Sequence, residues 1–307
     1  ADIGEFYLDD AYYDLSTTNH WWDSDLNKPV SVRKVIDDSG VTPILALPMI
    51  GSDAGNNLGS GGDFTVNSGP FTGTRGGSEF WARSVYFDGS TDYFNRGKLA
   101  GIADSKTMTL VFSYRPSSTA TNQRLFSIFN GATEIVNCHL LGANNRVYFR
   151  ASDASGYIDH GNSNEITVLD TWYTILISID VGTEANRHLY RNGVAENNWS
   201  SWVDSAALFS GSDTTDISLT GEIITGDMGF IYFSTDYIDF GDEANRLLFT
   251  DAFGYPTDLP AAIEDGTVAD PLVYMKFDDP SAYETNSGTG GDFTENGTPV
   301  SGADVTP

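Results

Sequence analysis

The sequence predicts an all-β protein built as an antiparallel β-sandwich. Apolar and polar residues alternate through many short segments, which is the pattern of strands with one buried face. Gly, Asn and Asp clusters separate these segments and supply turns. Stretches that suit a helix are few and short. Together these three observations favour two packed sheets over any helical architecture.

Two segments carry the clearest strand alternation. In Thr107–Tyr114 every second residue is apolar, and in Thr171–Val181 the pattern repeats. Successive side chains of a strand point to opposite faces, so each segment places one apolar row toward a core. The expected inward residues are Met108, Leu110, Phe112 and Tyr114, then Tyr173, Ile175, Ile177 and Ile179.

Turn chemistry predicts a hairpin and further strands. Asn192-Gly193 lies between His188–Arg191 and Val194–Glu196, and Asn-Gly suits the two positive-φ positions of a type I′ turn. Regularly spaced short strands of this kind are typical of sandwiches and jelly rolls. The remaining expected strands are Ser84–Asp88, Gln123–Phe129, Arg146–Ala151, Asp216–Thr220 and Gly229–Phe233.

Helices are expected in only two places. Asp242–Phe253 contains good helix formers, and Ser16–Asp25 is its weaker counterpart. The segments 51–77 and 278–307 are rich in Gly, Ser, Asn and Thr, so we expect long loops around one short strand in each.

An internal repeat organises the two ends of the chain. Gly61–Thr65 recurs as Gly290–Thr294, and Pro43–Leu47 matches Pro271–Met275. Two short blocks before them also match, Tyr7-Leu8 with Tyr232-Phe233 and Tyr13–Leu15 with Ile238–Phe240. The copies cover about 4–73 and 229–302, too few for a solenoid. Because an isolated strand pair is marginal in water, we expect the C-terminal copy to dock by strand addition or apolar packing, on its own sandwich or on a neighbouring subunit.

Charge and composition exclude several classes of protein. The 307 residues carry 16 Lys+Arg and 43 Asp+Glu, a formal net charge of −27, which excludes a nucleic-acid surface. No apolar run approaches the roughly 20 residues that a bilayer requires, so we expect no membrane insertion. The single cysteine, Cys138, is expected to be a buried apolar residue. The acidic surface suits a saline or extracellular setting.

An ordered set of motifs resembles the concanavalin A-like, laminin G-like jelly-roll superfamily. Ile44–Leu47 with Asp53–Asn57 resembles the opening strand and loop, and Ser84–Phe94 resembles the "F-D-G-x-x-D-Y" strand-turn-strand. Thr107–Pro116 resembles the next strand, and Trp172-Tyr173 with Leu189–Gly193 resembles a later pair. The resemblance implies a jelly roll over 43–235, flanked by an N-terminal segment, 1–42, and a C-terminal segment, 236–307.

The flanking repeats are similar to segments of tailed-phage virion structural proteins that carry laminin G-like modules. The resemblance implies a non-enzymatic virion structural or accessory protein on the outer surface of the particle. Its partners would be other virion proteins, copies of itself and a host surface glycan. The alternative is a secreted, extracellular lectin-like module that binds carbohydrate, with a glycoside hydrolase as a minor alternative.

Catalytic and metal motifs are weak in this sequence. The Glu-x-Asp-x-x-Glu string of the superfamily's glycosidases does not occur, and the four histidines lack zinc spacing. The resemblance implies calcium as a cofactor, held by Asp53 and Asp88, because Ca²⁺ prefers oxygen ligands. The alternative for both residues is ordinary turn chemistry.

Two tryptophans are candidate contact residues. Trp199 and Trp202 follow the predicted hairpin in a polar stretch, so we expect them to be exposed and to contact a glycan or a neighbouring subunit. Trp172 begins an alternating strand and is expected to pack in the core or on a sheet face.

Overall fold

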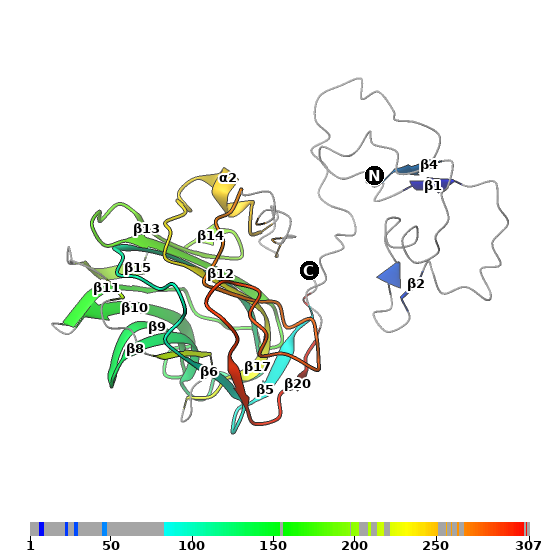
Figure 1. Ribbon diagram of the computed structural model, residues 1–307, viewed down its shortest axis with the longest axis horizontal. Helices are drawn as coiled ribbons and strands as arrows, with labels where there is room; N and C mark the ends of the chain where they lie inside the picture. The colour runs from blue at the N-terminus through cyan, green and yellow to red at the C-terminus, as the bar shows by residue number, and fades with distance from the viewer. Residues whose placement is uncertain are drawn as a thin grey trace, which may run out of the picture. The chain divides into compact units, whose positions relative to one another are not determined.

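The computed structural model describes two units of the chain, Ala1–Phe80 and Trp81–Pro307. In the first unit it describes residues 6–8, 22–23, 28–29 and 45–47. In the second it describes residues 83–153, 156–196, 198–202, 208–209, 214–217, 222–250, 256, 259, 263, 267–303 and 305. The second unit holds two large antiparallel sheets, which Figure 1 shows stacked on each other.

The first large sheet, called sheet I, runs in the order β14-β13-β12-β7-β17-β5-β20, and β18 pairs with β17. All of its pairings are antiparallel, and the longest strands, β7 and β17, lie at its centre. Its strands are β5 (Val85–Asp88), β7 (Thr107–Pro116), β12 (Tyr173–Asp180), β13 (Arg187–Arg191), β14 (Val194–Ala195), β17 (Thr225–Ser234), β18 (Val273–Met275) and β20 (Val300–Ser301).

The second large sheet, called sheet II, runs in the order β15-β11-β10-β9-β8-β16-β6-β19. It too is antiparallel throughout. Its strands are β6 (Tyr93–Gly97), β8 (Gln123–Asn130), β9 (Thr133–Leu141), β10 (Arg146–Asp153), β11 (Gly156–Asn162), β15 (Asn198–Trp202), β16 (Thr214–Ile217) and β19 (Thr294–Asn296).

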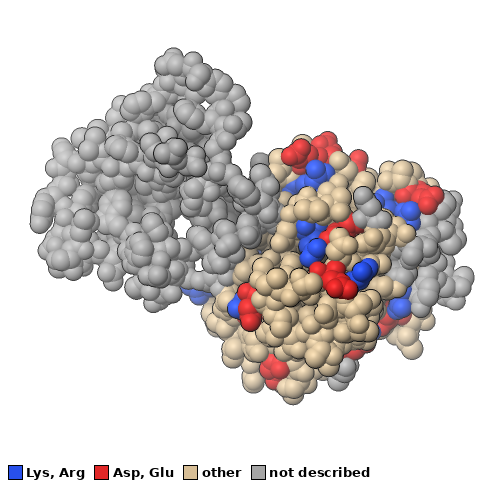
Figure 2. All heavy atoms as spheres, turned by 180° about the vertical axis from the view of Figure 1, so that it is seen from behind, with Lys and Arg blue, Asp and Glu red and all other residues tan. Residues whose placement is uncertain are grey.

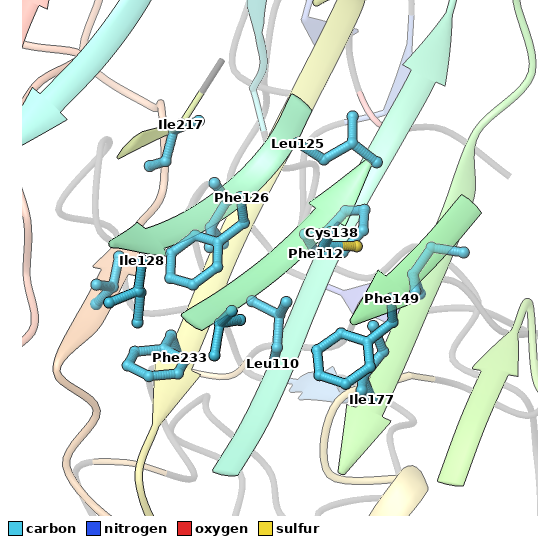
Figure 3. Close-up of a cluster of buried hydrophobic side chains, with 14 of the residues drawn as sticks. Leu110, Phe112, Leu125, Phe126, Ile128, Cys138, Phe149, Ile177, Ile217 and Phe233 are labelled. Carbon is cyan, nitrogen blue, oxygen red and sulfur yellow. The ribbon is translucent and has the colours of Figure 1, made fainter. Parts of the chain in front are cut away.

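The main core lies between the two sheets. The predicted inward rows of β7 and β12 are buried there, which confirms the alternation. Phe126 of sheet II packs against Phe233 of sheet I with ring centroids 5.2 Å apart and planes tilted by 37°. Figure 3 shows this cluster, with side chains of both sheets directed toward one another. Cys138 is completely buried in it, as expected, and burial raises the pKa of its thiol.

A second apolar cluster covers the outer face of sheet I. Val111, Leu176 and Tyr232 point away from the main core and contact residues of the segment that follows β17. That segment contributes Phe240, Phe249, Leu259 and Val268. It also contains the short helix α2 (Glu243–Arg246), which lies above β13 and β14 in the view of Figure 1. Sheet I therefore buries apolar side chains on both faces.

The helix expected over Asp242–Phe253 is a single turn. Asp242 caps its start, where its side chain accepts a hydrogen bond from the Ala244 amide at 2.9 Å. The chain after Arg246 turns inward because Phe249 packs edge-on against Tyr232 and Phe240. Tertiary packing of the aromatic rings outweighs the helix propensity of Leu247 and Leu248.

Two predicted turns have the expected geometry. Asn192 and Gly193 have φ angles of 49° and 74°, as a type I′ hairpin requires, and they join β13 to β14. The turn between β5 and β6 is capped by Asp88, whose carboxylate accepts hydrogen bonds from the amides of Ser90 and Thr91 at 2.7 and 2.9 Å.

The C-terminal repeat copy adds strands to its own sandwich. β18 pairs with β17 and β20 pairs with β5 in sheet I, while β19 pairs with β6 in sheet II. Of the two expected docking sites, the structure shows the one on the same module. The predicted domain boundary at residue 235 thus falls inside the sandwich, because strands of both sheets follow it.

Two small sheets are described in the first unit. β1 (Phe6–Leu8) pairs with β4 (Leu45–Leu47), and β2 (Trp22–Asp23) pairs with β3 (Lys28–Pro29). The weak helix prediction over Ser16–Asp25 is wrong at its described residues, because Trp22 and Asp23 form extended backbone in β2.

Phe233→Ala should strongly destabilise the sandwich. Phe233 is fully buried and contacts Phe126 and Phe209, so truncation leaves a cavity between the sheets. We expect a loss of roughly 3–5 kcal/mol in the free energy of unfolding, measured by urea denaturation. Val300→Ala is the matched control, because Val300 is 56% exposed, and it should cost less than about 0.5 kcal/mol. Equal effects of both changes would contradict this packing.

Candidate functional site

The outer face of sheet II is polar, unlike that of sheet I. In β10 the residues Val147, Phe149 and Ala151 face the core, so Arg146, Tyr148 and Arg150 face outward. The strand register aligns outward residues of neighbouring strands into two rows. One row is Arg124, His139, Tyr148 and Asn162, and the other is Asp216, Ser127, Asn137 and Arg150. We call this surface the polar face.

Arg124 lies at the centre of an ion-pair network on the polar face. Its guanidinium contacts the carboxylates of Glu134 and Glu222, the second at 2.5 Å. Arg150 contacts the other oxygen of Glu134 at 2.6 Å. The Arg124 side chain is only 10% exposed, so these charges are held largely out of water. Buried pairs of this kind fix side-chain positions more than they add stability.

Two rings lie side by side in the neighbouring row. His139 and Tyr148 have ring centroids 5.4 Å apart and planes within 2° of parallel. The Nδ1 atom of His139 lies 2.8 Å from the Asn137 side-chain oxygen. The Asn137 amide group in turn donates to Glu134. The rings and the ion pairs are therefore parts of one connected surface.

Two guanidinium N–H groups on this face have no protein acceptor. The Nε atoms of Arg124 and Arg146 are buried and make no hydrogen bond within the described part of the chain. Another nitrogen of Arg146 donates to Asn162 at 3.1 Å, which fixes the position of the side chain. A buried donor without an acceptor costs about 1–3 kcal/mol. Both groups are therefore donors whose hydrogen-bonding capacity the described part of the chain leaves unused.

Asp216 borders the network on β16. It is buried, and burial raises the pKa of its carboxyl to about 6, although the nearby Arg124 charge acts in the opposite direction. The folded protein thus binds this proton more tightly than the unfolded chain does. Stability gained from that proton is complete below pH 4 and is lost as the pH rises through about 6.

Asp216→Asn should remove part of the pH dependence of stability. The amide cannot ionise, so the variant should be more stable than the parent at pH 7.5 by about 1–3 kcal/mol and similar to it at pH 4. Thermal melts between pH 4 and 8 measure this. Asp88→Asn is a suitable control, because hydrogen bonds from Ser90 and Thr91 lower the Asp88 pKa, so this carboxyl stays ionised over the measured range and the variant's curve should run parallel to the parent's. Parallel curves for Asp216→Asn and the parent would contradict the assignment.

The carboxylate of Asp88 is engaged within the turn between β5 and β6. Its carboxylate oxygens already accept hydrogen bonds from Ser90 and Thr91. No group of three or more His, Cys, Asp or Glu side chains that could hold a metal occurs in the described residues. Asp53, the other expected ligand, lies outside them. Calcium binding therefore stays a prediction that comes from the resemblance.

The calcium prediction has a direct thermal test. Bound Ca²⁺ would stabilise the folded state by mass action, so EDTA should lower the Tm and added Ca²⁺ should restore it. Differential scanning calorimetry of the full chain measures both steps. An unchanged Tm in both conditions would contradict calcium binding at Asp53 or elsewhere.

Trp199 lies at the edge of the sandwich and is partly buried. Its ring packs against the core cluster, edge-on to Phe149 with centroids 6.4 Å apart. The Arg187 guanidinium covers the ring at 5.4 Å from its centroid. Trp202 pairs with Asp159 in β15, and Trp172 is buried, as expected. The structure thus places Trp199 away from the polar face, so contact of either β15 tryptophan with a glycan or a subunit stays a prediction.

The sequence carries one signal of the polar face. Through Glu134–Leu141 and Arg146–Ala151 the residues between the apolar ones are Arg, Glu, Asn, His and Tyr, a run richer in planar polar groups than a solvated strand face needs. Glu222 lies far away in sequence, and only the fold brings it to Arg124.

Comparison with known proteins gives the class of fold. No protein-family model matches the sequence, and no curated protein matches it. A candidate carbohydrate-binding protein from Bacteroides ovatus ATCC 8483 superposes with a TM-score of 0.52 at 12% identity. The match covers 74% of this chain and 62% of that one, so the chain spans less than two thirds of its length.

Two further structures superpose on smaller parts of the chain. The SAP-like pentraxin of Limulus polyphemus has a TM-score of 0.41 at 12% identity, over 53% of this chain and 80% of its own. Domains LG4-5 of the mouse laminin alpha1 chain have a TM-score of 0.39 at 14% identity, over 58% and 48%. The two stacked sheets make the protein an antiparallel β-sandwich of the jelly-roll type, as the sequence predicts. No helix in the described part of the chain is long and apolar enough to cross a bilayer.

Proposed function

We propose that the protein is a non-enzymatic carbohydrate-binding module whose polar face binds a neutral glycan. The observation that carries the proposal is the pair of buried, unpartnered Nε–H groups of Arg124 and Arg146 beside the stacked rings of His139 and Tyr148. The shared fold with a candidate carbohydrate-binding protein supports this class of function.

Sugars match the chemistry of the polar face. A pyranose presents hydroxyl oxygens that accept hydrogen bonds, together with an apolar C–H face that packs on aromatic rings. The guanidinium groups of Arg124 and Arg146 supply donors, and Tyr148 supplies a half-buried ring. Glu134 holds Arg124 and Arg150 in place, so little side-chain entropy is lost on binding.

Charge favours a neutral ligand over an acidic one. The charges of Arg124 and Arg150 are balanced by Glu134 and Glu222, and the Asp216 carboxyl lies near Arg124 as well. The whole chain carries −27 and repels anions at long range. Figure 2 shows that on the face it displays, blue and red side chains lie next to each other, with no large basic patch.

Catalysis is not part of the proposal. Glu134 and Glu222 are the two carboxylates that Arg124 brings together, and both are engaged with its guanidinium, so neither is free to act on a glycosidic bond. Location on a virion remains a prediction from the flanking repeats. It is compatible with glycan binding, because an outer-surface module can serve as an adhesin.

A glycan array followed by calorimetric titration tests the proposal. We expect the array to give a neutral oligosaccharide, whose Kd should rise at least about tenfold in Tyr148→Ala and in Arg146→Ala, since each removes a direct contact of about 1.4 kcal/mol or more. The Kd should change little between 0.1 and 1 M NaCl, because screening weakens only charged ligands.

Variants elsewhere on the sandwich serve as controls. Val194→Ser changes an exposed side chain on sheet I, and Trp199→Ala changes the sandwich edge. Both should leave the Kd within about twofold at a temperature where the variant is fully folded, although Trp199→Ala should lower the Tm because its ring packs against the core. Loss of binding in Trp199→Ala with full binding in Tyr148→Ala would place the ligand on β15 instead. No array signal at all would contradict glycan binding.

A further inference from the structure

The two repeat copies form the same strand pair in the same register. In the C-terminal copy Ile231, Tyr232 and Phe233 pair with Met275, Tyr274 and Val273. In the N-terminal copy Phe6, Tyr7 and Leu8 pair with Leu47, Ala46 and Leu45. These are the positions that the sequence repeat aligns, residue for residue. The similarity in sequence is therefore a similarity in backbone pairing.

The repeated glycine-rich motif is the part of the C-terminal copy that contacts the rest of the sandwich. Gly290 accepts a hydrogen bond from the Ala100 amide at 3.0 Å, and Arg96 donates to the Asp292 carbonyl oxygen at 2.5 Å. Gly291 has a φ of +85°, and a Cβ there would lie 2.6 Å from the Arg96 guanidinium. Phe293 is buried in the main core, and Thr294 pairs with Asn95. The N-terminal copy has the same five residues as Gly61–Thr65.

The residues around the motif are repeated as well. Asn286 is buried, and its side chain joins the Tyr274 amide at 2.7 Å to the Leu272 carbonyl at 2.9 Å. In the alignment that matches Gly61 with Gly290, its counterpart is Asn57. Gly302 has no room for a side chain, since a Cβ would lie 2.2 Å from Asp227, and it recurs as Gly73.

In the C-terminal copy these residues close a sandwich that the preceding residues leave open. We call residues 83–228 the scaffold and residues 229–302 the closing segment. The closing segment supplies β18 and β20 to sheet I and β19 to sheet II, and its contacts with Ser84, Arg96 and Ala100 belong to the scaffold. These positions on the scaffold are therefore filled.

We propose that residues 4–73 are a second closing segment, and that their partner is another open β-sandwich scaffold built like residues 83–228. The N-terminal copy keeps the residues that contact a scaffold, while the scaffold of this chain already holds the C-terminal copy. A two-stranded sheet such as β1 and β4 is marginal in water by itself. The chain would thus join two sandwiches, one closed by each copy, through strand addition to both sheets.

A graft tests the fit. In the full chain, residues 271–302 are replaced by 43–73, which keeps β17 and, apart from Tyr274, the cluster on the outer face of sheet I. A second graft replaces 229–302 by 4–73. We expect the first graft to melt in one cooperative transition with a Tm lowered by less than about 10 °C, and to keep the strand signal in circular dichroism. Random sequence of the same composition in that place is the control and should abolish the transition.

Point changes inside the graft make the result specific. The grafted Gly62, which takes the place of Gly291, is changed to Val, and the grafted Asn57 is changed to Ala. Either change should unfold the grafted protein, while Gly62→Val at its natural place in the parent chain should leave the sandwich transition unchanged. Loss of the transition in both unmodified grafts would overturn the proposal. So would a first graft that tolerates Gly62→Val and Asn57→Ala, because the motif would then make no defined contacts.

Discussion

The position of β17 is the constraint on which the rest of the sandwich depends. This strand pairs with β7 along one edge and with β5 and β18 along the other. Ile231 and Phe233 point into the main core, whereas Phe230 and Tyr232 point to the opposite side. A strand that is apolar on both faces must be covered on both faces. The chain after β17 therefore has to fold over sheet I, where it buries Val111, Leu176 and Tyr232.

The polar face of sheet II is the consequence of that arrangement. With sheet I covered, the outward side chains of β8, β9 and β10 form the sheet surface that can accept a ligand. Desolvated charges there are costly unless they are paired, and Arg124 is paired with two carboxylates. Such a network adds little to stability, but it presents fixed donors and rings. Rigid polar groups on strands suit the recognition of a polyhydroxylated ligand more closely than flexible loop residues do.

Local patterns in the sequence predict the strands. The pairings and helix ends that these patterns do not predict depend on contacts between residues far apart in the chain. The alternation through Met108 and Tyr114, the Asn192-Gly193 turn and the burial of Cys138 each follow from a few neighbouring residues. The pairing of β19 with β6 joins residues about 200 positions apart in the chain, for example Thr294 with Asn95, and no local pattern reports that. The short helix is a similar case, because contacts of Phe249 with distant rings end it early.

The candidate site was less predictable than the fold for the same reason. Arg124, Glu134 and Glu222 come from three separate segments, so their network exists only in the folded chain. Trp199 was predicted to be exposed because it is a large aromatic residue in a polar stretch. Its ring instead packs against the sandwich, because Gly161 has no side chain there. Sequence alone shows which residues can stack on a sugar, but the sheet face to which each belongs depends on strand register.

Chemical-shift mapping by NMR with a bound oligosaccharide tests the central claim, that the polar face binds the glycan, most directly. Titration of the isotope-labelled protein should move the backbone amide signals of Asn137, His139 and Tyr148 together, along one saturable curve. Signals of Leu176 and Tyr232, which lie under the cover of sheet I, should stay in place. Shifts confined to residues of sheet I, or to the β15 edge around Trp199, would contradict the account.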